Sequence, residues 1–271
     1  MSAPRPGSVR VTGRSRAWLA AYALLAAGCS APSHESGFVE RTLMWRGVPR
    51  PYQVWVPPAY SRQHRWPVIL FLHGSGERGS DGRRQIESGM GPALLRFPER
   101  YPAIVVFPQA QADERWPGDA AAFALATLDH ARKEFRVDRR REYVIGVSMG
   151  GNGAWYLAYR FPERFAAIVS ICGWFVPRDD EPTSEPVVPA RDGPPDAALA
   201  RRVAHLPIWI VHGDSDPIIP PDDSRRIGGL LASLHAPARY TELKNTGHDA
   251  WDPAFADPEL PAWLFTQRRR H

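Results

Sequence analysis

The chain has 271 residues, of which 44% are hydrophobic and 11% aromatic, and its formal net charge is +5. It is long enough for one large α/β domain with a buried core, and its apolar content excludes a disordered or fibrous protein. Part of the excess arginine lies near the two ends of the sequence, and no basic stripe is interleaved with aromatic residues. Nucleic acid is therefore not an expected partner.

The first 28 residues have the pattern of a secretory signal peptide. Four arginines precede an apolar stretch at residues 17–27, which is too short to cross a bilayer core of about 30 Å. Cys29 follows Ala-Ala-Gly as in a bacterial lipobox, so we expect it to be lipidated and to begin the mature chain. The protein would then be secreted across the inner membrane and anchored in the cell envelope, facing the periplasm or at the outer membrane. An ordinary cleaved signal peptide and an uncleaved anchor are the alternatives.

Residues 29–36 are small and polar after the cysteine, and we interpret them as a tether to a catalytic domain at residues 37–271. If Cys29 is lipidated, Cys172 is the only other cysteine, and no disulfide can form within the mature chain. The oligomeric state is left open by the sequence.

Apolar runs of strand length alternate with longer helical patterns throughout the expected domain. The expected strands cover residues 39–45, 52–56, 68–72, 104–107, 143–147, 166–172, 208–211 and 239–243, and the expected helices cover residues 86–96, 120–135, 149–160, 222–234 and 258–267. The middle strands are continuously apolar, which is typical of strands that are buried on both faces of a sheet. The pattern predicts an α/β fold with a mostly parallel central sheet of about eight strands and helices on both faces, the first two strands forming an antiparallel edge.

Residues 177–197 interrupt this alternation with a segment rich in proline and acidic residues. We expect an insertion at the surface, either a solvated or mobile loop or a lid over a site.

The sequence Gly146-Val147-Ser148-Met149-Gly150 lies between an apolar strand pattern and a helical one. This context predicts a nucleophile elbow, in which a strained turn lifts the serine hydroxyl above the sheet. Glycines on either side of the serine allow the strand and the helix to approach each other closely. Ser148 is therefore the expected nucleophile.

A serine nucleophile needs a histidine base and a carboxylate that orients it, and in elbow hydrolases these follow the serine in the order acid, then histidine. The strand at 208–211 is followed by Asp214 and Asp216. We favour Asp216, because it lies further beyond the strand and its Asp-Pro step fixes a turn, and we expect Asp214 to brace the loop. His248 is the only histidine in the loop after the last expected strand.

An acyl-transfer site also needs donors for the oxyanion. The backbone N–H of Met149 is one candidate, and the N–H of Ser75, in the glycine-rich loop after the strand at 68–72, is the other. The same loop formally matches a dinucleotide fingerprint at Gly74, Gly76 and Gly79, but no helix opens there and no acid ends the next strand. We therefore expect no cofactor.

The other histidines do not have metal-ligand spacing, so we expect no metal. His73 and His212 end buried strands, where an imidazole usually holds loops by hydrogen bonds.

The chain resembles the esterase group of the α/β hydrolases, which includes members labelled as peptidases, near the phospholipase/carboxylesterase and feruloyl-esterase-like branches. The stretches that carry the resemblance are FLHGSGERGSD (71–81), VVFPQ (105–109), GVSMGGNGAW (146–155), FPERFAAIVSICG (161–173), PIWIVHGDSDPIIP (207–220) and GHDAWDPAFADPELPAWLFTQ (247–267). The resemblance implies Ser148, Asp216 and His248 as a triad, and the amides of Ser75 and Met149 as the oxyanion hole. It also implies that Trp251 lies near the site.

The expected function is therefore hydrolysis of small-molecule carboxylic esters through an acyl-enzyme. The alternatives are a serine peptidase with the same triad and a non-catalytic surface lipoprotein. The insertion at 177–197 is longer than the link that relatives usually have, so the acyl and alcohol preferences are left open.

Overall fold

The computed structural model describes residues 1, 35–180 and 185–269. The chain divides into two units, residues 1–33 and residues 34–271, and the architecture below is that of the second unit alone. The expected signal peptide and Cys29 lie outside the described residues. Among the described residues, no helix combines the length and the apolar character needed to cross a membrane.

A single eight-stranded sheet forms the centre of the domain, with the strand order β1-β2-β4-β3-β5-β6-β7-β8. The strands are β1 (Gly37–Trp45), β2 (Val48–Val56), β3 (Trp66–Leu72), β4 (Ile104–Phe107), β5 (Val137–Val147), β6 (Ala167–Ile171), β7 (Ile208–Gly213) and β8 (Ala238–Leu243). β1 pairs with β2, and β2 with β4, in antiparallel register, whereas all the other pairs are parallel. The mostly parallel sheet with an antiparallel edge confirms the prediction.

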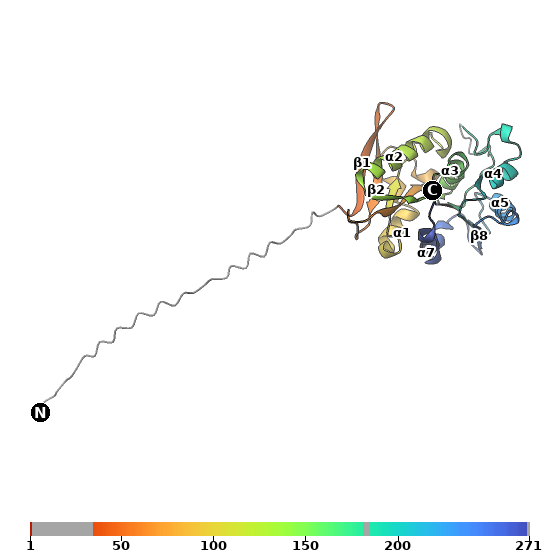
Figure 1. Cartoon of the computed structure of the whole chain (residues 1–271). Coiled ribbons are helices and arrows are strands. Elements are labelled where there is room, and N and C mark those ends of the chain that lie inside the picture. Colours follow the sequence, from red (N-terminus) through yellow and green to blue (C-terminus); the bar gives the residue numbers. More distant parts are fainter. Residues whose placement is uncertain (2–34, 181–184, 270–271) are drawn as a thin grey trace. The chain divides into compact units, whose positions relative to one another are not determined.

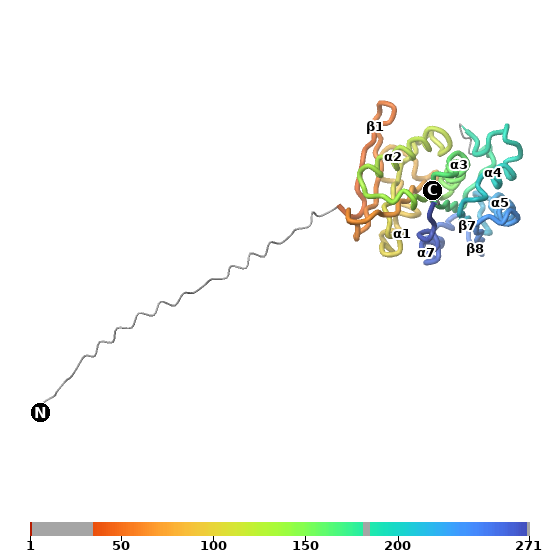
Figure 2. Tube along the Cα trace, in the orientation of Figure 1, coloured from red at the N-terminus to blue at the C-terminus, as the bar shows by residue number. Residues whose placement is uncertain are grey.

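Helices cover both faces of this sheet (Figure 1). One face packs against α2 (Ala121–Glu134), α3 (Met149–Arg160), α4 (Pro195–Val203) and α5 (Asp222–Ser233), and the other against α1 (Met90–Arg96), α6 (Trp251–Ala256) and α7 (Glu259–Thr266). Short helical turns are η1 (Ser75–Glu77), η2 (Arg84–Ile86), η3 (Pro98–Arg100), η4 (Trp116–Ala120) and η5 (Ala190–Asp192). The tube in Figure 2 follows the alternation of strand and helix along the chain.

The core has two halves because successive side chains of a strand point to opposite faces of the sheet. In β3, Val68 and Leu70 pack with the cluster under α2 and α3, whereas Ile69 and Phe71 pack with the cluster under α1 and α6. All four side chains are at most 1% exposed. A strand that is buried on both faces therefore has no polar position, as its sequence predicts.

The structure differs from the expectations mainly in short elements. β5 begins at Val137, before the expected residue 143, because Val137 pairs with Trp66 across an irregularity in the ladder. The expected helix at 86–96 is regular only from Met90. Two helices were not expected, α4 and α6, which have nine and six residues.

The described part of the insertion at 177–197 packs against α3. Tyr156 donates to Glu185 at 2.8 Å, Tyr159 donates to Asp192 at 2.7 Å, and Val187 is 2% exposed. These contacts bury part of the segment against the outer side of α3, and α4 begins at its end.

Candidate active site

Ser148 occupies a sharp turn between β5 and α3. Its backbone has φ 55° and ψ −118°, a conformation that costs roughly 1–3 kcal/mol for a residue with a side chain. The Ser148 N–H donates to the carbonyl of Ile171 at 2.8 Å, which ties the turn to β6. A Cβ on Gly146 would lie 1.9 Å from the carbonyl oxygen of Gly150, and a Cβ on Gly150 would lie 1.8 Å from that of Leu72. Both glycines are therefore required for the helix to start this close to the sheet.

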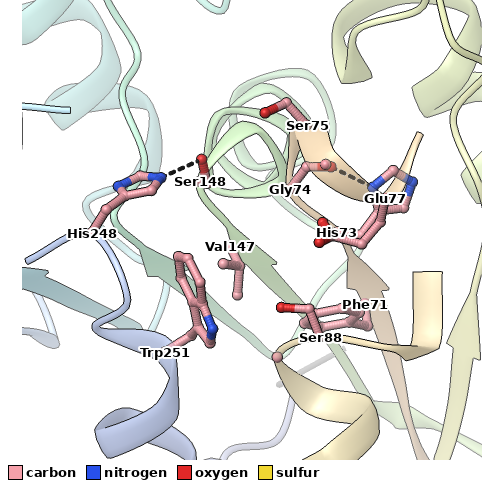
Figure 3. A pocket seen from close by; sticks show the side chains of 12 residues that line it. Phe71, His73, Gly74, Ser75, Glu77, Ser88, Val147, Ser148, His248 and Trp251 are labelled. Atoms are coloured by element: carbon pink, nitrogen blue, oxygen red, sulfur yellow. Dashed lines mark hydrogen bonds between the residues drawn. The ribbon is translucent and has the colours of Figure 1, made fainter. Parts of the chain in front are cut away.

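The structure brings Ser148, His248 and Asp216 into one hydrogen-bonded chain (Figure 3 shows the serine and the histidine). His248 Nε2 is 2.9 Å from Ser148 Oγ, and His248 Nδ1 is 2.7 Å from Asp216 Oδ2. Ser148 and Asp216 are 8% and 6% exposed. Three loops that are far apart in sequence supply these groups, and they meet because parallel strands end at the same edge of the sheet.

Asp216 is held as a carboxylate. Burial raises its pKa, but hydrogen bonds from His248 and from the amides of Ile219 and Ile218 outweigh burial, so that the pKa lies below its ordinary value. The two amides donate to Oδ1 at 2.9 Å each and leave Oδ2 for the imidazole. An ionised carboxylate at Nδ1 fixes the histidine with Nε2 toward the serine.

Asp214, the alternative acid, has other partners. Its Oδ1 accepts the hydroxyl of Ser215 at 2.8 Å and the amide of Thr246 at 3.3 Å. The residue therefore joins the loop after β7 to the loop that carries His248, which is the bracing role expected of it.

The amides of Ser75 and Met149 each begin a helical turn near the serine. Ser75 is the first residue of η1 and Met149 the first of α3, so neither N–H has a partner inside its own helix. A Cβ on Gly74 would lie 3.6 Å from Ser148 Cβ, which places the glycine-rich loop beside the nucleophile.

His73 orients the peptide that carries the Ser75 N–H. The imidazole Nε2 accepts the amide of Ala110 at 3.0 Å, so Nδ1 bears the proton and donates to the carbonyl of Gly74 at 2.6 Å. The C=O and N–H of a trans peptide point in opposite directions, so the Ser75 N–H points away from His73. Burial lowers the pKa of His73 to about 4, and the ring is neutral at neutral pH.

A hollow of about 220 Å³ adjoins Ser148 and His248. Figure 3 shows the side chains around it, which come from β3, the glycine-rich loop, the turn before α1, the end of β5 with the elbow, and the loop that leads into α6. Trp251 stands edge-on to His248, with the ring centroids 5.4 Å apart, as part of the wall. Three other tryptophans near the sequence motifs, Trp116, Trp155 and Trp174, are buried in the core under α2 and α3.

Glu77 contributes a carboxyl group to this hollow and was not expected from the sequence. Burial raises its pKa, and the amides of Glu77 and Gly74 offset only part of that effect. A partly desolvated acid thus lines the hollow together with the apolar side chains of Phe71 and Trp251.

Gln109 was also not assigned a role by residue pattern. It is 2% exposed, its Oε1 accepts the amide of Gly82 at 2.8 Å, and its Nε2 donates to the carbonyl of Glu77 at 3.0 Å. It therefore fixes both ends of the glycine-rich loop. Its partners come from a distant part of the chain, so only the family resemblance, which includes VVFPQ, pointed to it.

Cys172, His212 and Asp216 are the one group of three potential metal ligands found in the described part of the chain. Each already has protein partners. The thiol of Cys172 donates to the His248 carbonyl at 3.3 Å, and His212 contacts Ser224 Oγ and the Ile219 carbonyl at 2.8 Å each. His212 also lies beside the carboxylate of Asp216, with its Nε2 3.3 Å from Oδ2. This geometry suits a histidine that gives Asp216 a second support.

Residues 47–255 match the family model described as "Putative esterase". A curated relative, "Putative esterase NocK" from Nocardia uniformis subsp. tsuyamanensis, is 28% identical over 199 residues, which are 70% of this chain and 52% of the relative. An "Uncharacterized secreted protein" from Arthroderma benhamiae is 24% identical over 240 residues, 77% of this chain and 24% of that protein. The chain thus spans about half the length of one curated relative and about a quarter of the other.

Solved structures with the same fold include a thermostable esterase, which is 28% identical with a TM-score of 0.73 and covers 86% of this chain and 63% of its own. A ferulic acid esterase has a TM-score of 0.63 at 21% identity, and the match covers 86% of this chain and 98% of the esterase. A ferulic acid esterase of Anaeromyces mucronatus, in complex with ferulic acid, has a TM-score of 0.62 at 14% identity, covering 87% and 92%. The expected α/β-hydrolase fold is confirmed by these likenesses.

Proposed function

This chain belongs to the esterase family, and on that premise we propose that it hydrolyses carboxylic esters through an acyl-enzyme on Ser148. The observation that carries the proposal is the hydrogen-bonded chain from Ser148 through His248 to the ionised Asp216, placed on a strained elbow beside an open hollow. A structural serine does not need a base and an orienting carboxylate in this order.

In the first step, Ser148 Oγ attacks the ester carbonyl carbon while His248 Nε2 takes the hydroxyl proton. The C–O bond to the alcohol then breaks, and the histidine returns the proton to the leaving alkoxide. Asp216 stabilises the imidazolium between these two transfers. The amides of Ser75 and Met149 donate to the oxyanion of each tetrahedral intermediate. Water, deprotonated by the same histidine, then attacks the acyl carbon. The bond to Ser148 Oγ breaks, His248 returns the proton to that oxygen, and the carboxylic acid leaves.

The test is hydrolysis of a small aryl acetate by the full chain and by Ser148→Ala. We expect a loss of roughly 10⁴-fold or more in kcat, because the substitution removes the nucleophile and leaves only binding and oxyanion stabilisation. Asp216→Asn should lose about 10⁴-fold, whereas Asp214→Asn, at the neighbouring acid, should stay close to the wild type. Full activity in Ser148→Ala, or equal losses at the two aspartates, would overturn the proposal.

A fluorophosphonate probe separates this function from a non-catalytic role. We expect one covalent adduct, on the peptide that contains Ser148, and no adduct in the Ser148→Ala variant. A panel of aryl, feruloyl and acetyl-sugar esters beside matched peptide amides then identifies the substrate class. Faster cleavage of the amides would replace the esterase with a peptidase that uses the same residues.

For the N-terminal segment, we propose a cleaved leader and a lipid on Cys29. The support is the sequence pattern of four arginines, a short apolar stretch and the lipobox-like Ala-Ala-Gly-Cys. The test is metabolic labelling of the full chain with a radioactive fatty acid. Label in the wild type that disappears in Cys29→Ala supports the lipid, and unlabelled protein in the culture supernatant argues for ordinary secretion.

A further inference from the structure

Cationic side chains gather at the end of the domain opposite the active site. They surround a shallow hollow of about 290 Å³ where α2 ends and β3 and β5 begin. We name this surface the arginine-rich end and define it by Arg62, Arg65, Arg132, Lys133, Arg136 and Arg139. The one acidic side chain that lines the hollow, Glu134, is already paired with Arg41 at 2.6 Å.

Most of these cations have no carboxylate beside them. Within the described residues, the side chains of Arg65, Lys133, Arg136 and Arg139 form no ion pair, and all four are exposed. Elsewhere in the described domain some arginines pair with a carboxylate, as Arg225 does with Glu242 at 2.8 Å, and others, such as Arg83 and Arg239, form no ion pair. What distinguishes this end of the domain is that several cations without a carboxylate surround a single hollow.

Helix capping accounts for only part of the cluster. Cations near a helix C-terminus interact favourably with its unpaired carbonyls, and Arg62 donates to the carbonyl of Glu134, the last residue of α2, at 3.2 Å. Arg65, Arg136 and Arg139 lie outside the helix and point to no carbonyl or carboxylate of the described chain. Capping of α2 therefore does not account for their gathering around one hollow.

The cluster is separated from the serine by the length of the sheet. Arg139 lies near the start of β5 and Ser148 directly after its end. The segment from Glu142 to Ser148 alone spans about 20 Å at roughly 3.3 Å per residue. A large partner on the arginine-rich end would therefore leave the hollow beside Ser148 open.

The N-terminal segment joins the domain at this same end. Gly37, the first residue of β1, pairs with Val56, and Val56 leads into the loop that carries Arg62 and Arg65. The described domain therefore begins at the end that carries the cationic cluster.

From these observations we infer that the arginine-rich end is a docking surface for a membrane of anionic phospholipid. Guanidinium groups bind phosphate oxygens through paired hydrogen bonds, and several cations in one plane match the negative surface of such a bilayer. A single-stranded nucleic acid would call for aromatic platforms, whereas Phe135, the one aromatic residue that lines the hollow, packs against the core. Docking at this end turns the catalytic edge away from the lipid.

The experiment is sedimentation of the full chain with vesicles, in a Cys29→Ala background so that no thioether-linked lipid contributes. We compare vesicles of phosphatidylcholine with vesicles that also contain phosphatidylglycerol, at low and at high salt. The chain should bind the anionic vesicles at least about tenfold more tightly, and salt should abolish the difference.

A matched pair of variants assigns the binding to the cluster. Arg65→Gln, Arg136→Gln and Arg139→Gln together should weaken anionic-vesicle binding at least about tenfold. Arg83→Gln, Arg84→Gln and Lys244→Gln together remove the same charge from exposed positions near the catalytic edge and should leave the binding within about twofold of the parent. Turnover of a chromogenic ester by the triple variant of the arginine-rich end shows that this variant is folded.

Three results would overturn the inference. Equal losses in the two triple variants would indicate net charge instead of a surface, and equal binding to neutral vesicles would indicate the apolar N-terminal segment. The third is tighter binding to single-stranded DNA than to anionic vesicles. If the triple variant of the arginine-rich end lost that DNA binding, the surface would be reassigned to nucleic acid.

Discussion

His73 influences the expected oxyanion hole without contacting the reacting atoms. Its Nδ1–H holds the Gly74 carbonyl at 2.6 Å and thereby sets the direction of the Ser75 N–H. In His73→Leu that peptide can rotate, so we expect kcat to fall about 10- to 100-fold with little change in KM, because the lost interaction acts mainly on the transition state. Steady-state kinetics on an aryl acetate measure both constants.

The conservative variant is the control for this positioning role. An asparagine at this position would retain a donor near the place of Nδ1, so His73→Asn should recover part of the kcat that His73→Leu loses. If the two variants have the same kcat, or if the loss is entirely in KM, His73 does not position the donor.

Glu77 places a carboxyl group in the hollow beside Ser148. It lines the hollow beside Ser148, where burial raises its pKa and solvent screens it less than at the surface. Glu77→Gln should increase kcat/KM for an ester with an anionic acyl group by about tenfold relative to its neutral isostere. Parallel assays of the two esters give this ratio. An unchanged ratio would mean that the acyl group does not pass near Glu77.

At the residue scale, local pattern predicted the three groups of the hydrogen-bonded chain but not the groups that support them. Ser148, Asp216 and His248 each follow a strand in a recognisable turn, and parallel strands bring such turns to one edge. Gln109 and Glu77 owe their positions to contacts between loops, which spacing along the sequence does not encode.

At the scale of elements, the approach of α3 to the sheet depends on glycine. A Cβ on Gly150 would lie 1.8 Å from the Leu72 carbonyl oxygen, a clash with backbone that side-chain rotation cannot relieve. Gly150→Ala should therefore lower the free energy of unfolding by about 3 kcal/mol or more. Chemical denaturation with a far-ultraviolet circular dichroism readout measures the change.

Gly229 offers the matched control for that substitution. It lies in α5, it is exposed, and apart from its chain neighbours and the backbone of its own helix nothing lies within 4 Å of the position that a Cβ would take there. Gly229→Ala should raise the free energy of unfolding by roughly 0.5–1 kcal/mol, because alanine is the better helix former. Similar changes at both glycines would contradict the close packing at the elbow.

The sequence predicted long or continuously apolar elements better than short ones. Strands such as β3 and β7 are buried on both faces, so their composition alone identifies them. α6 has only six residues, and it is stabilised by burial of Ala254 and Phe255 against the sheet instead of by its own periodicity. The early start of β5 depends on an irregular pairing with Trp66, a tertiary contact that its polar sequence does not reveal.

At the scale of the whole molecule, the two ends of the sheet differ in chemistry. The carboxyl ends of the parallel strands carry the serine, its histidine and their buried carboxylate, whereas the amino ends carry the arginine-rich end. β5 runs from one of these ends to the other. A partner bound at the amino ends of the strands therefore need not obstruct the hollow beside Ser148 at their carboxyl ends. The fold thus separates the proposed docking surface from the proposed chemistry.

The stability of the whole domain should depend on pH through its buried histidines. Burial lowers the pKa of His73 to about 4, and it also lowers the pKa of His212. Between about pH 6.5 and 4 the unfolded chain takes up a proton at His73 that the folded chain does not, so acid favours unfolding. The contribution of His73 to the free energy of unfolding is fully present above about pH 6.5. It declines by up to about 1.4 kcal/mol per pH unit below that pH, and it stops changing below the pKa of His73 in the folded protein.

Urea denaturation at a series of pH values between about 7 and about 4 measures this dependence. His73→Asn removes the titrating group, so its free energy of unfolding should fall less steeply with acid than that of the parent, by up to about 1.4 kcal/mol per pH unit. His235→Asn, at an exposed histidine, should keep the parent's slope. A slope that is unchanged in His73→Asn would mean that His73 takes up its proton as readily in the folded protein as in the unfolded chain. Burial would then not lower its pKa.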